Sequence, residues 1–359
     1  MRILLLGENS GLYRYLKQGL LELGHDVTFA ADGDGWKKIS GYDIPIYTTK
    51  RRNSIAGKID RYIVKPIKDT RFSNYDIVQV VSPGVFYWSI IPIMFKKLKR
   101  TNKRVFLSIS GLSPDMYNYW KNNKYGIYYQ MFYKSPELLK DYESKSLFKS
   151  MRWKAIDVAY KSVDGLIPVI PFEYEKPYSQ RKNIRKAITL PVNVNEIQYK
   201  PNIVNDKIVF FHGINSYESK GSEIIINAMK KIEEKYNTDV ECIVADRMPY
   251  NEYLDTINKA NVIIDQCKSY GYGMNACISL AKGKLVMSGA EKQVFETIPK
   301  EECPIYNILP EEDQIFKEME RIIADRNNIE EIGERGRKYI EKYHDHVSVA
   351  KQYIKEWNS

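Results

Sequence analysis

The sequence predicts an α/β protein of two Rossmann-like, doubly wound domains. At 359 residues, the chain is about twice as long as a typical single domain of roughly 150 residues. Short apolar runs alternate with amphipathic helical segments, which is the pattern of a mostly parallel sheet covered by helices. The alternation is interrupted by a loop-like segment at residues 190–195 and then begins again. We therefore expect a first domain over residues 1–194 and a second domain over residues 195–341.

The first series of elements consists of strands separated by helices. Apolar, β-branched runs predict strands at residues 2–8, 26–31, 75–82, 103–111 and 163–170. Between the first two strands, Leu12, Leu16 and Leu20 recur on one face of a helix that Gly24 ends. Residues 112–150 depart from this pattern because they are rich in Tyr, Trp and Lys, and they predict an aromatic insertion beside the sheet.

The second series repeats the alternation. Strands are predicted at residues 206–214, 239–245, 261–266 and 284–289. Helices are predicted at residues 220–236 and 250–260, and a further helix follows the glycine-rich stretch "SYGYGMN" at 269–275. The amphipathic segment 342–357 predicts a C-terminal helix, and we expect residues 342–359 to join the first domain.

Charge is distributed unevenly along the chain. Residues 1–200 hold 34 Lys and Arg against 18 Asp and Glu, a balance of +16, whereas residues 201–359 hold 21 against 27, a balance of −6. This asymmetry favours two domains with different partners. Basic clusters such as "KKLKR" at 96–100 suit anionic lipid headgroups, so we expect peripheral contact with an anionic membrane. We expect no nucleic-acid partner, because the sequence has no zinc-finger, RRM or KH motif.

Cysteine use and hydropathy predict a cytoplasmic protein. Its expected contact with lipid would place it at the inner face of the cell membrane. The start "MRILLLG" is too short for a signal peptide and fits a buried strand. No apolar run reaches the roughly 18–20 residues of a membrane-spanning helix. The four cysteines show neither CxxC nor metal-ligand spacing, which is typical of reduced core residues.

The strand-end segments of the second series carry the candidate ligand site. Ligands of open α/β sheets bind beyond the carboxyl ends of the strands, so the loops there should share one rim. The rim residues are His212, Gly213, Asn215, Lys220, Arg247, Met248, Tyr270, Gly271, Tyr272, Gly273, Met274 and Asn275. Backbone N–H groups at a helix start, with a lysine beside them, suit a phosphorylated small ligand. His212 ends a buried strand, so a structural role suits it equally well.

The segments "FFHGI", "KGSEIIINAM" and "YGYGMNACISLAKGKLVMSG" resemble the second domain of glycosyltransferase family 4. The resemblance is most specific over residues 207–290, and "RILLLGENSG", "YDIVQV" and "RVFLSISG" are compatible with the first domain of that family. It implies the two-domain GT-B fold, in which the domains face each other across a cleft. A nucleotide-sugar donor would be held by the second domain and an acceptor by the first. It also implies transfer with retention of configuration and without a metal ion or other cofactor, the nucleoside-diphosphate sugar being a substrate.

The same resemblance assigns roles on the donor side. Lys220 would contact the donor diphosphate and is the first catalytic candidate, and Arg247 and Met248 would border the nucleobase. Residues 271–275 would present backbone N–H groups to the donor sugar and phosphate. Transfer would then depend on positioning the two substrates and on stabilising the departing diphosphate.

Strand-end loops of the first domain would lie across the cleft, near the acceptor. The acceptor-side candidates are Asn9, Ser10, Gly11, Ser110, Gly111 and Asp115. Glu8 is the second catalytic candidate, because its carboxylate and that of Asp115 are placed to contact an acceptor hydroxyl.

Together these features predict a metal-independent, retaining hexosyltransferase. It would move a hexose or N-acetylhexosamine from a nucleoside-diphosphate sugar to a glycan acceptor, lipid-linked, in surface polysaccharide biosynthesis. The paired glutamates of the resembled family fall here on Tyr270 and Ile278, neither of which is acidic. A nucleotide-sugar epimerase or a catalytically weak sugar-binding subunit of the same fold therefore stays open. A non-enzymatic polyanion-binding protein is the second alternative, because the first half is basic.

Overall fold

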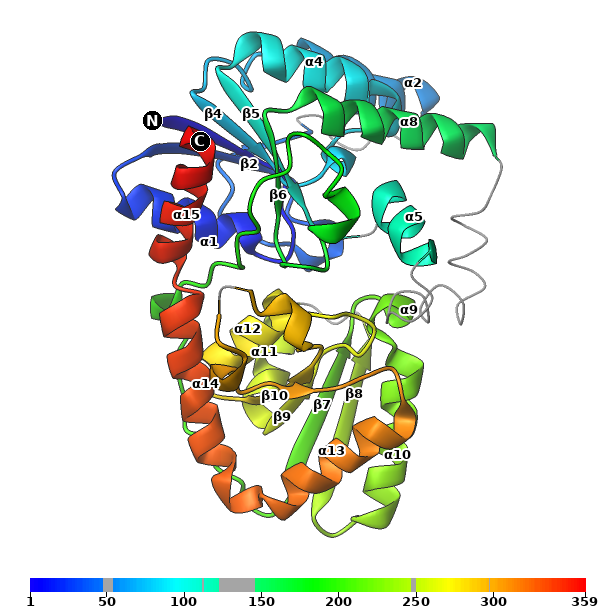
Figure 1. Ribbon diagram of the computed structural model, residues 1–359, viewed down its shortest axis with the longest axis vertical. Coiled ribbons are helices and arrows are strands. Elements are labelled where there is room, and N and C mark those ends of the chain that lie inside the picture. The colour runs from blue at the N-terminus through cyan, green and yellow to red at the C-terminus, as the bar shows by residue number, and fades with distance from the viewer. Residues whose placement is uncertain (48–53, 112, 123–145, 247–249, 297) are drawn as a thin grey trace.

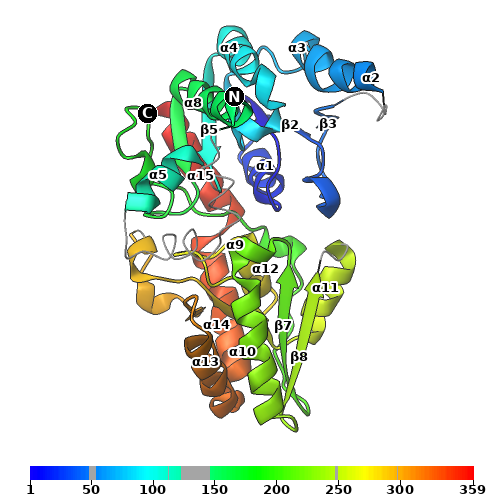
Figure 2. The same ribbon diagram turned by 90° about the vertical axis from the view of Figure 1, so that its right-hand side faces the viewer.

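The computed structural model places two α/β domains one above the other (Figures 1 and 2). It describes residues 1–47, 54–111, 113–122, 146–246, 250–296 and 298–359. Each domain is built on a parallel sheet, so the predicted fold class is confirmed. The segment that joins the last strand of the first sheet to the first strand of the second contains the predicted domain boundary at residues 194 and 195.

The first sheet has six parallel strands in the order β3-β2-β1-β4-β5-β6. Their bounds are β1 Arg2–Leu6, β2 Asp26–Ala31, β3 Ile44–Pro45, β4 Ile77–Val80, β5 Arg104–Ile109 and β6 Gly165–Pro168. The register pairs Leu4 of β1 with Thr28 of β2 on one side and Val78 of β4 on the other. Pro45 is tolerated in β3 because this strand lies at the edge of the sheet.

Helices cover both faces of this sheet, which explains why residues 3–6 of its central strand β1 are all apolar. Ile3 and Leu5 pack in one buried cluster with α1 (Leu12–Glu22) and α15 (His346–Asn358). Leu4 and Leu6 point to the opposite face and pack in a second cluster with α4 (Ile91–Thr101) and α8 (Leu147–Ser162). The other helices of this domain are α2 Ile55–Ile59, the π-helical η2 Asp60–Val64, α3 Lys65–Lys68 and α5 Pro114–Asn122, with short 3₁₀ turns η1 Gly35–Lys37, η3 Pro83–Val85, η4 Trp88–Ile90, η5 Lys176–Tyr178 and η6 Val194–Glu196.

The second sheet has five parallel strands in the order β11-β10-β9-β7-β8. Their bounds are β7 Ile208–Ile214, β8 Val240–Asp246, β9 Val262–Ile264, β10 Leu285–Ser288 and β11 Tyr306–Asn307. The helices are α9 Tyr217–Lys220, α10 Ser222–Lys235, α11 Tyr250–Lys259, α12 Met274–Ala281, α13 Glu312–Ala324 and α14 Ile329–Tyr343, with 3₁₀ turns η7 Lys292–Val294, η8 Lys300–Glu302 and η9 Arg326–Asn328. Helices α10 and α13 pack together on one face of the sheet, and α12 packs against α14 on the other.

The C-terminal segment differs from the single helix predicted from residue 342. Helix α14 ends at Tyr343, and a new helix, α15, begins at His346. Asp345 separates them because its Oδ1 accepts the backbone N–H of Ser348 at 2.8 Å and caps α15. The chain turns at this cap, and α15 lies against α1 of the first domain (Figure 1).

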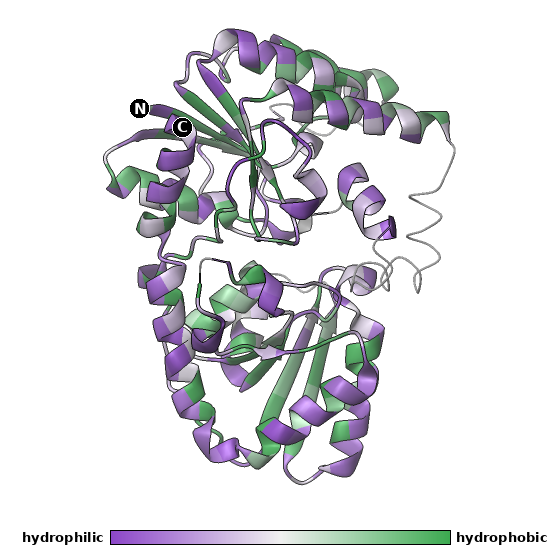
Figure 3. Cartoon of the chain, in the orientation of Figure 1, coloured by the Kyte–Doolittle hydropathy of each residue, from purple (hydrophilic) through white to green (hydrophobic). Residues whose placement is uncertain are grey.

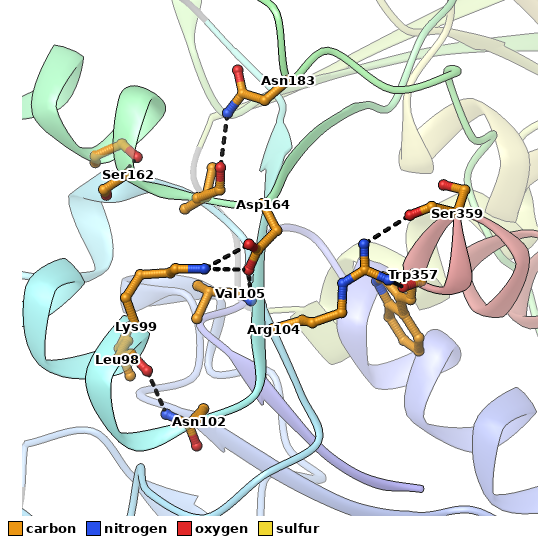
Figure 4. A network of polar contacts seen from close by, with 12 residues as sticks. Leu98, Lys99, Asn102, Arg104, Val105, Ser162, Asp164, Asn183, Trp357 and Ser359 are labelled. Atoms are coloured by element: carbon orange, nitrogen blue, oxygen red, sulfur yellow. Dashed lines mark hydrogen bonds and ion pairs between the residues drawn. The ribbon is translucent and has the colours of Figure 1, made fainter.

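Polar contacts fix α15 to the first sheet (Figure 4). Arg104 of β5 donates to the backbone carbonyl of Trp357, and its Nη2 donates to that of Ser359 at 2.7 Å. The indole Nε1 of the fully buried Trp357 donates to Gln79 Oε1 at 2.8 Å. Residues more than 250 positions apart in the sequence are thus joined in one domain.

Hydrophilic and hydrophobic residues are interspersed along the elements of both domains (Figure 3). Among the residues that the structure describes, no helix has both the length and the apolar character needed to cross a membrane. All four cysteines are free thiols.

Candidate functional site

A cavity of about 460 Å³ lies between the two domains. The first domain lines it with segments that follow β1, β5 and β6, and the second with segments that follow β7 and β9. Because all these segments follow strand ends, the carboxyl edges of both sheets face the same cleft. This is the place where open α/β sheets bind ligands.

Sequence-predicted residues from both domains meet in this cavity. They are Asn9, Ser10, Ser110 and Gly111 from the first domain and Gly273 and Met274 from the second. Asn9 Nδ2 donates to Ser110 Oγ at 3.4 Å, so the loops after β1 and β5 contact each other. A smaller cavity of about 100 Å³ is lined by Gly213, Asn215, Lys220 and Asn275, and Ser10 lines both cavities.

Lys220 is held in the wall of the smaller cavity by a buried carboxylate. Its Nζ donates to the backbone carbonyl of Gly213 at 2.9 Å and to Asp265 Oδ1 at 3.0 Å. The Oδ1 of Asp265 also accepts Asn275 Nδ2 at 2.8 Å, and Asn275 Oδ1 accepts the hydroxyl of Tyr253. Burial opposes ionisation of Asp265, but Lys220 and Asn275 hold its pKa below the usual range.

The sequence reading missed Asp265, because residues 261–266 were assigned as strand. In the structure β9 ends at Ile264, so Asp265 is the first residue beyond the strand end. A strand end placed two residues earlier in the sequence would have identified Asp265, because the rim residues are predicted from their positions after strand ends.

Lys37 is a second cation at the smaller cavity that the sequence reading missed. It belongs to the 3₁₀ turn η1, and its Nζ lies 2.6 Å from Asp34 Oδ2 and 2.8 Å from Ser10 Oγ. Asp34 Oδ2 also accepts the backbone N–H of Ser10 at 2.9 Å. The two domains therefore place one lysine each beside the same cavity, and each lysine is paired with a carboxylate.

The start of α12 faces the larger cavity. Its N-cap residue is Gly273, which has no side chain to accept hydrogen bonds from the first N–H groups of the helix. A Cβ built on Gly273 would meet no atom within 4 Å, so the space in front of this helix start is open. Gly271 differs, because a Cβ there would lie 2.8 Å from Cγ2 of Ile170. The two glycines of "GYG" thus serve different purposes: Gly271 allows close packing between the domains, and Gly273 leaves the cleft open.

Glu173, which the sequence reading also missed, joins the two domains beside the larger cavity. It follows β6 in the first domain and is fully buried. Its Oε2 accepts the Ser269 hydroxyl at 2.8 Å and the backbone N–H of Gly271 at 2.9 Å. The N–H of Gly271 is thus taken by Glu173. A single acidic residue in a loop carries no periodic signal, so only the three-dimensional structure identifies it.

Glu8 and Gly11 belong to the loop between β1 and α1, and the Glu8 carboxylate fixes this loop through hydrogen bonds. The carboxylate of Glu8 accepts backbone N–H groups of Asn9, Gly11, Tyr13 and Arg14 at the start of α1. Burial raises the pKa of Glu8 to about 7, although these N–H groups oppose the rise. Neither Glu8 nor Gly11 lines one of the two cavities described above.

Asp115 lies in a different hollow of the first domain. It forms an ion pair with Arg181 at 2.9 Å, and Arg181 also contacts Asp157 at 2.8 Å. Burial raises the pKa of Asp115 although Arg181 opposes the rise. Asp115 therefore does not line the inter-domain cavity that Ser110 lines, although the sequence predicts both on the acceptor side.

Three donor-side candidates are buried away from both cavities. His212 Nδ1 donates to the Ile264 carbonyl at 2.7 Å, and its Nε2 lies 2.9 Å from the Ser222 hydroxyl. Burial, with Lys220 nearby, lowers the pKa of His212 to about 4. His212 lies within β7, and these contacts give it a structural role, which is one of the two roles that the sequence left open.

Tyr270 and Tyr272 likewise serve packing. The ring of Tyr270 stacks on Trp120 of α5, with 5.1 Å between centroids, and so inserts into the core of the first domain. The hydroxyl of Tyr272 lies 2.6 Å from that of Tyr339 and 3.0 Å from His344 Nε2. The two remaining donor-side candidates, Arg247 and Met248, lie outside the described residues.

No group of three or more His, Cys, Asp or Glu side chains in the described ranges is arranged to hold a metal ion. The polar groups that line the two cavities are hydroxyls, amides, a helix start, three lysines (Lys37, Lys220 and Lys268) and the carboxylates of Glu173 and Glu218. The lysines and the helix start suit phosphate groups, and the hydroxyls and amides suit a hydroxyl-rich ligand.

No protein-family model and no curated protein sequence matches the chain. Solved structures do match it over its whole length. Sucrose-phosphate synthase from Thermosynechococcus elongatus has 14% identity and a TM-score of 0.61, covering 100% of this chain and 98% of that one. Anabaena HepE in complex with UDP and glucose has 12% identity and a TM-score of 0.64, covering 100% of both chains. An α-glucosyltransferase in complex with UDP-glucose and DNA containing an abasic site has 11% identity and a TM-score of 0.64, covering 100% and 99%. At these identities the likeness shows the fold, which is the GT-B arrangement predicted from the sequence.

Proposed function

We propose that the protein is a glycosyltransferase that takes its sugar from a nucleoside-diphosphate donor bound between the two domains. The observation that carries the proposal is the open helix start at Gly273, which faces the inter-domain cleft. Asn275, in the first turn of the same helix, shares the Asp265 carboxylate with Lys220. In the same fold, the structures of HepE and of the α-glucosyltransferase hold UDP or UDP-glucose. UDP-glucose is therefore the first donor to test.

The proposed reaction is transfer with retention of configuration and without a metal ion. N–H groups at the start of α12 and the ammonium groups of Lys220 and Lys37 would stabilise the charge that develops on the departing diphosphate. Because Asp265 and Asp34 fix these lysines, little reorganisation is needed when the bond to the sugar breaks. Asn9 and Ser110, across the cavity, would orient the acceptor hydroxyl.

For the acceptor we propose a glycan, lipid-linked, of a surface polysaccharide. The acceptor would enter on the side of the first domain, whose sequence is the basic half of the chain. The same reasoning places the enzyme in the cytoplasm at the inner face of the cell membrane. The pathway and the membrane location rest on this charge asymmetry and on the resemblance of the sequence.

A second candidate is a nucleotide-sugar-binding protein of the same fold that does not transfer the sugar. Ile278 lines the smaller cavity, and Tyr270 packs against Trp120, where the resembled family has its two carboxylates. Without them the donor would be held less tightly at its ribose. Binding without transfer would favour this candidate.

The test compares Gly273→Ala with Gly84→Ala. A methyl group at residue 273 meets no protein atom within 4 Å, so it enters the open space before α12 without disturbing the fold. Residue 84 is an exposed glycine outside the cleft, where a methyl group makes only an ordinary contact of 3.5 Å with Ser82 Oγ, which makes it the matched control.

The assay measures release of the nucleoside diphosphate from UDP-glucose and related donors. We expect Gly273→Ala to lower the rate at subsaturating donor by at least about tenfold, because it blocks approach to the helix start. Its melting temperature and the activity of Gly84→Ala should stay at wild-type values. A Gly273→Ala variant as active as wild type would contradict the proposed donor site.

A further inference from the structure

The first domain exposes large apolar side chains on an outer surface formed by α2, the segment before α4, and α8. We name this surface the amphipathic face and define it by Ile55, Ile59, Tyr87, Leu147, Phe148 and Met151. Ile55 is 79% exposed, and Leu147 and Phe148 are 73% and 72% exposed. Contiguous exposed apolar side chains of this kind mark a surface that meets a partner.

Aromatic contacts join the two ends of the amphipathic face. The ring of Tyr62 in η2 lies 6.5 Å from that of Tyr87, and Tyr87 lies 6.0 Å from Trp88. Trp88 in turn meets Phe148 of α8 edge to face at 6.3 Å. Aromatic side chains therefore connect η2, which continues α2, with α8. In Figure 2, α4 lies between α8 and α2 at the outer end of the first domain.

Helix α8 shows the composition of this face most clearly. Leu147, Met151 and Val158 recur at spacings of four and seven residues, so they lie on one side of the helix, and all three are exposed. Lys154 and Lys161 occupy the same side at the intervening helical positions and are exposed too. Ala155 and Ala159, which lie further round the helix, are buried against the domain.

The charge around the amphipathic face has one sign. Residues 54–101 and 146–162, which contain α2, α4 and α8, hold 13 Lys and Arg against four Asp and Glu. Lys58, Lys96 and Arg152 are exposed on the three helices in turn. Three of the four acidic residues are paired: Asp69 with Arg71, Asp76 with Lys103, and Asp157 with Lys161 and Arg181.

We propose that the amphipathic face docks on the surface of an anionic lipid bilayer. Apolar side chains that enter the acyl boundary, flanked by lysines and arginines at headgroup level, are the two features of an interfacial membrane site. Tyr87 and Trp88 suit the headgroup region, because their rings carry a polar atom. The negatively charged headgroups would balance the excess of lysines and arginines, and the acyl region would cover the apolar side chains. A single partner, the anionic bilayer, therefore accounts for both the charge and the exposed apolar side chains.

The experiment measures co-sedimentation of the full chain with lipid vesicles. The wild-type protein should bind vesicles of phosphatidylcholine with phosphatidylglycerol and should bind vesicles of phosphatidylcholine alone far more weakly. The double variant Leu147→Ser with Phe148→Ser should lower binding by at least about tenfold, because it removes apolar contact area. The double variant Arg152→Glu with Lys154→Glu should lower it by about fivefold or more for each charge.

Ile203→Ser is the matched control, because Ile203 is 61% exposed but lies outside the first domain's face, just before the second sheet. It should bind vesicles as the wild type does, and all variants should keep the wild-type melting temperature. Equal binding by Leu147→Ser with Phe148→Ser and by wild type would overturn the proposal. So would a wild-type dimer that this double variant dissociates, because a second copy would then cover the face. Duplex DNA that binds as tightly as the vesicles, and equally to the double variant, would identify a site for polyanions and also overturn it.

Discussion

Replacing Glu173 tests whether a carboxylate of the first domain fixes the glycine-rich loop of the second. In Glu173→Ala the backbone N–H of Gly271 loses its acceptor, which lies 2.9 Å away in the wild type. A buried N–H without an acceptor costs about 1–3 kcal/mol. The Ser269 hydroxyl also loses its acceptor, but it can rotate toward another group, so we add about 1 kcal/mol. We expect the free energy of unfolding to fall by about 3 kcal/mol.

The assay is urea denaturation of four proteins: wild type, Glu173→Ala, Ser269→Ala and the double variant. Because residues 173 and 269 are in direct contact, the two single effects should not add, and their coupling should be about 1 kcal/mol. Glu173→Gln is the matched control, since its amide oxygen can still accept the Gly271 N–H, and it should lose less than about 1 kcal/mol. Equal stability of Glu173→Ala and Glu173→Gln, with no coupling to Ser269, would refute the reasoning.

Two further substitutions test the buried charges of the cleft. Lys220→Met should lower the free energy of unfolding by about 3–5 kcal/mol, because it leaves the buried Asp265 carboxylate without its cation, and adding Asp265→Asn should restore most of the loss. A Lys220→Met variant as stable as wild type in urea would show that Asp265 does not depend on this lysine. Burial raises the pKa of Glu8 from 4.5 to about 7 in the folded state. Between these pH values the folded state binds a proton that the unfolded state has lost. Glu8 therefore makes the protein less stable as the pH rises from 4.5 to about 7. Glu8→Gln should remove this pH dependence, which amounts to about 3 kcal/mol in the free energy of unfolding between pH 4.5 and 7. A melting temperature that changes with pH equally in wild type and Glu8→Gln would contradict this expectation.

The sequence predicted the strands well where burial on two faces left a clear pattern. β1, β2, β4 and β5 each fall inside an apolar run of the expected range, because strands covered on both faces have no polar side. The two-residue edge strands Ile44–Pro45 and Tyr306–Asn307 were missed, because so short a segment has no periodicity. The break between α14 and α15 was missed as well, since Asp345 stands within an otherwise continuous helical pattern.

The candidate site was predictable only where position along a strand determines it. Asn9, Ser110, Lys220 and Gly273 follow strand ends, and the structure brings them to the cleft. The residue that a side chain contacts could not be predicted in this way, because such contacts join segments that are distant in the sequence. Tyr270 was expected beside a donor, but it stacks on Trp120, which is 150 positions earlier in the chain.

The most direct test of the donor site is a calorimetric titration of UDP, and of UDP-glucose, into the wild type and Gly273→Ala. We expect the wild type to bind with a measurable dissociation constant, and the variant to bind at least about tenfold more weakly at an unchanged melting temperature. Equal affinity in both proteins, or no binding of any nucleoside diphosphate or its sugar to the wild type, would contradict the proposal that the open start of α12 holds the donor.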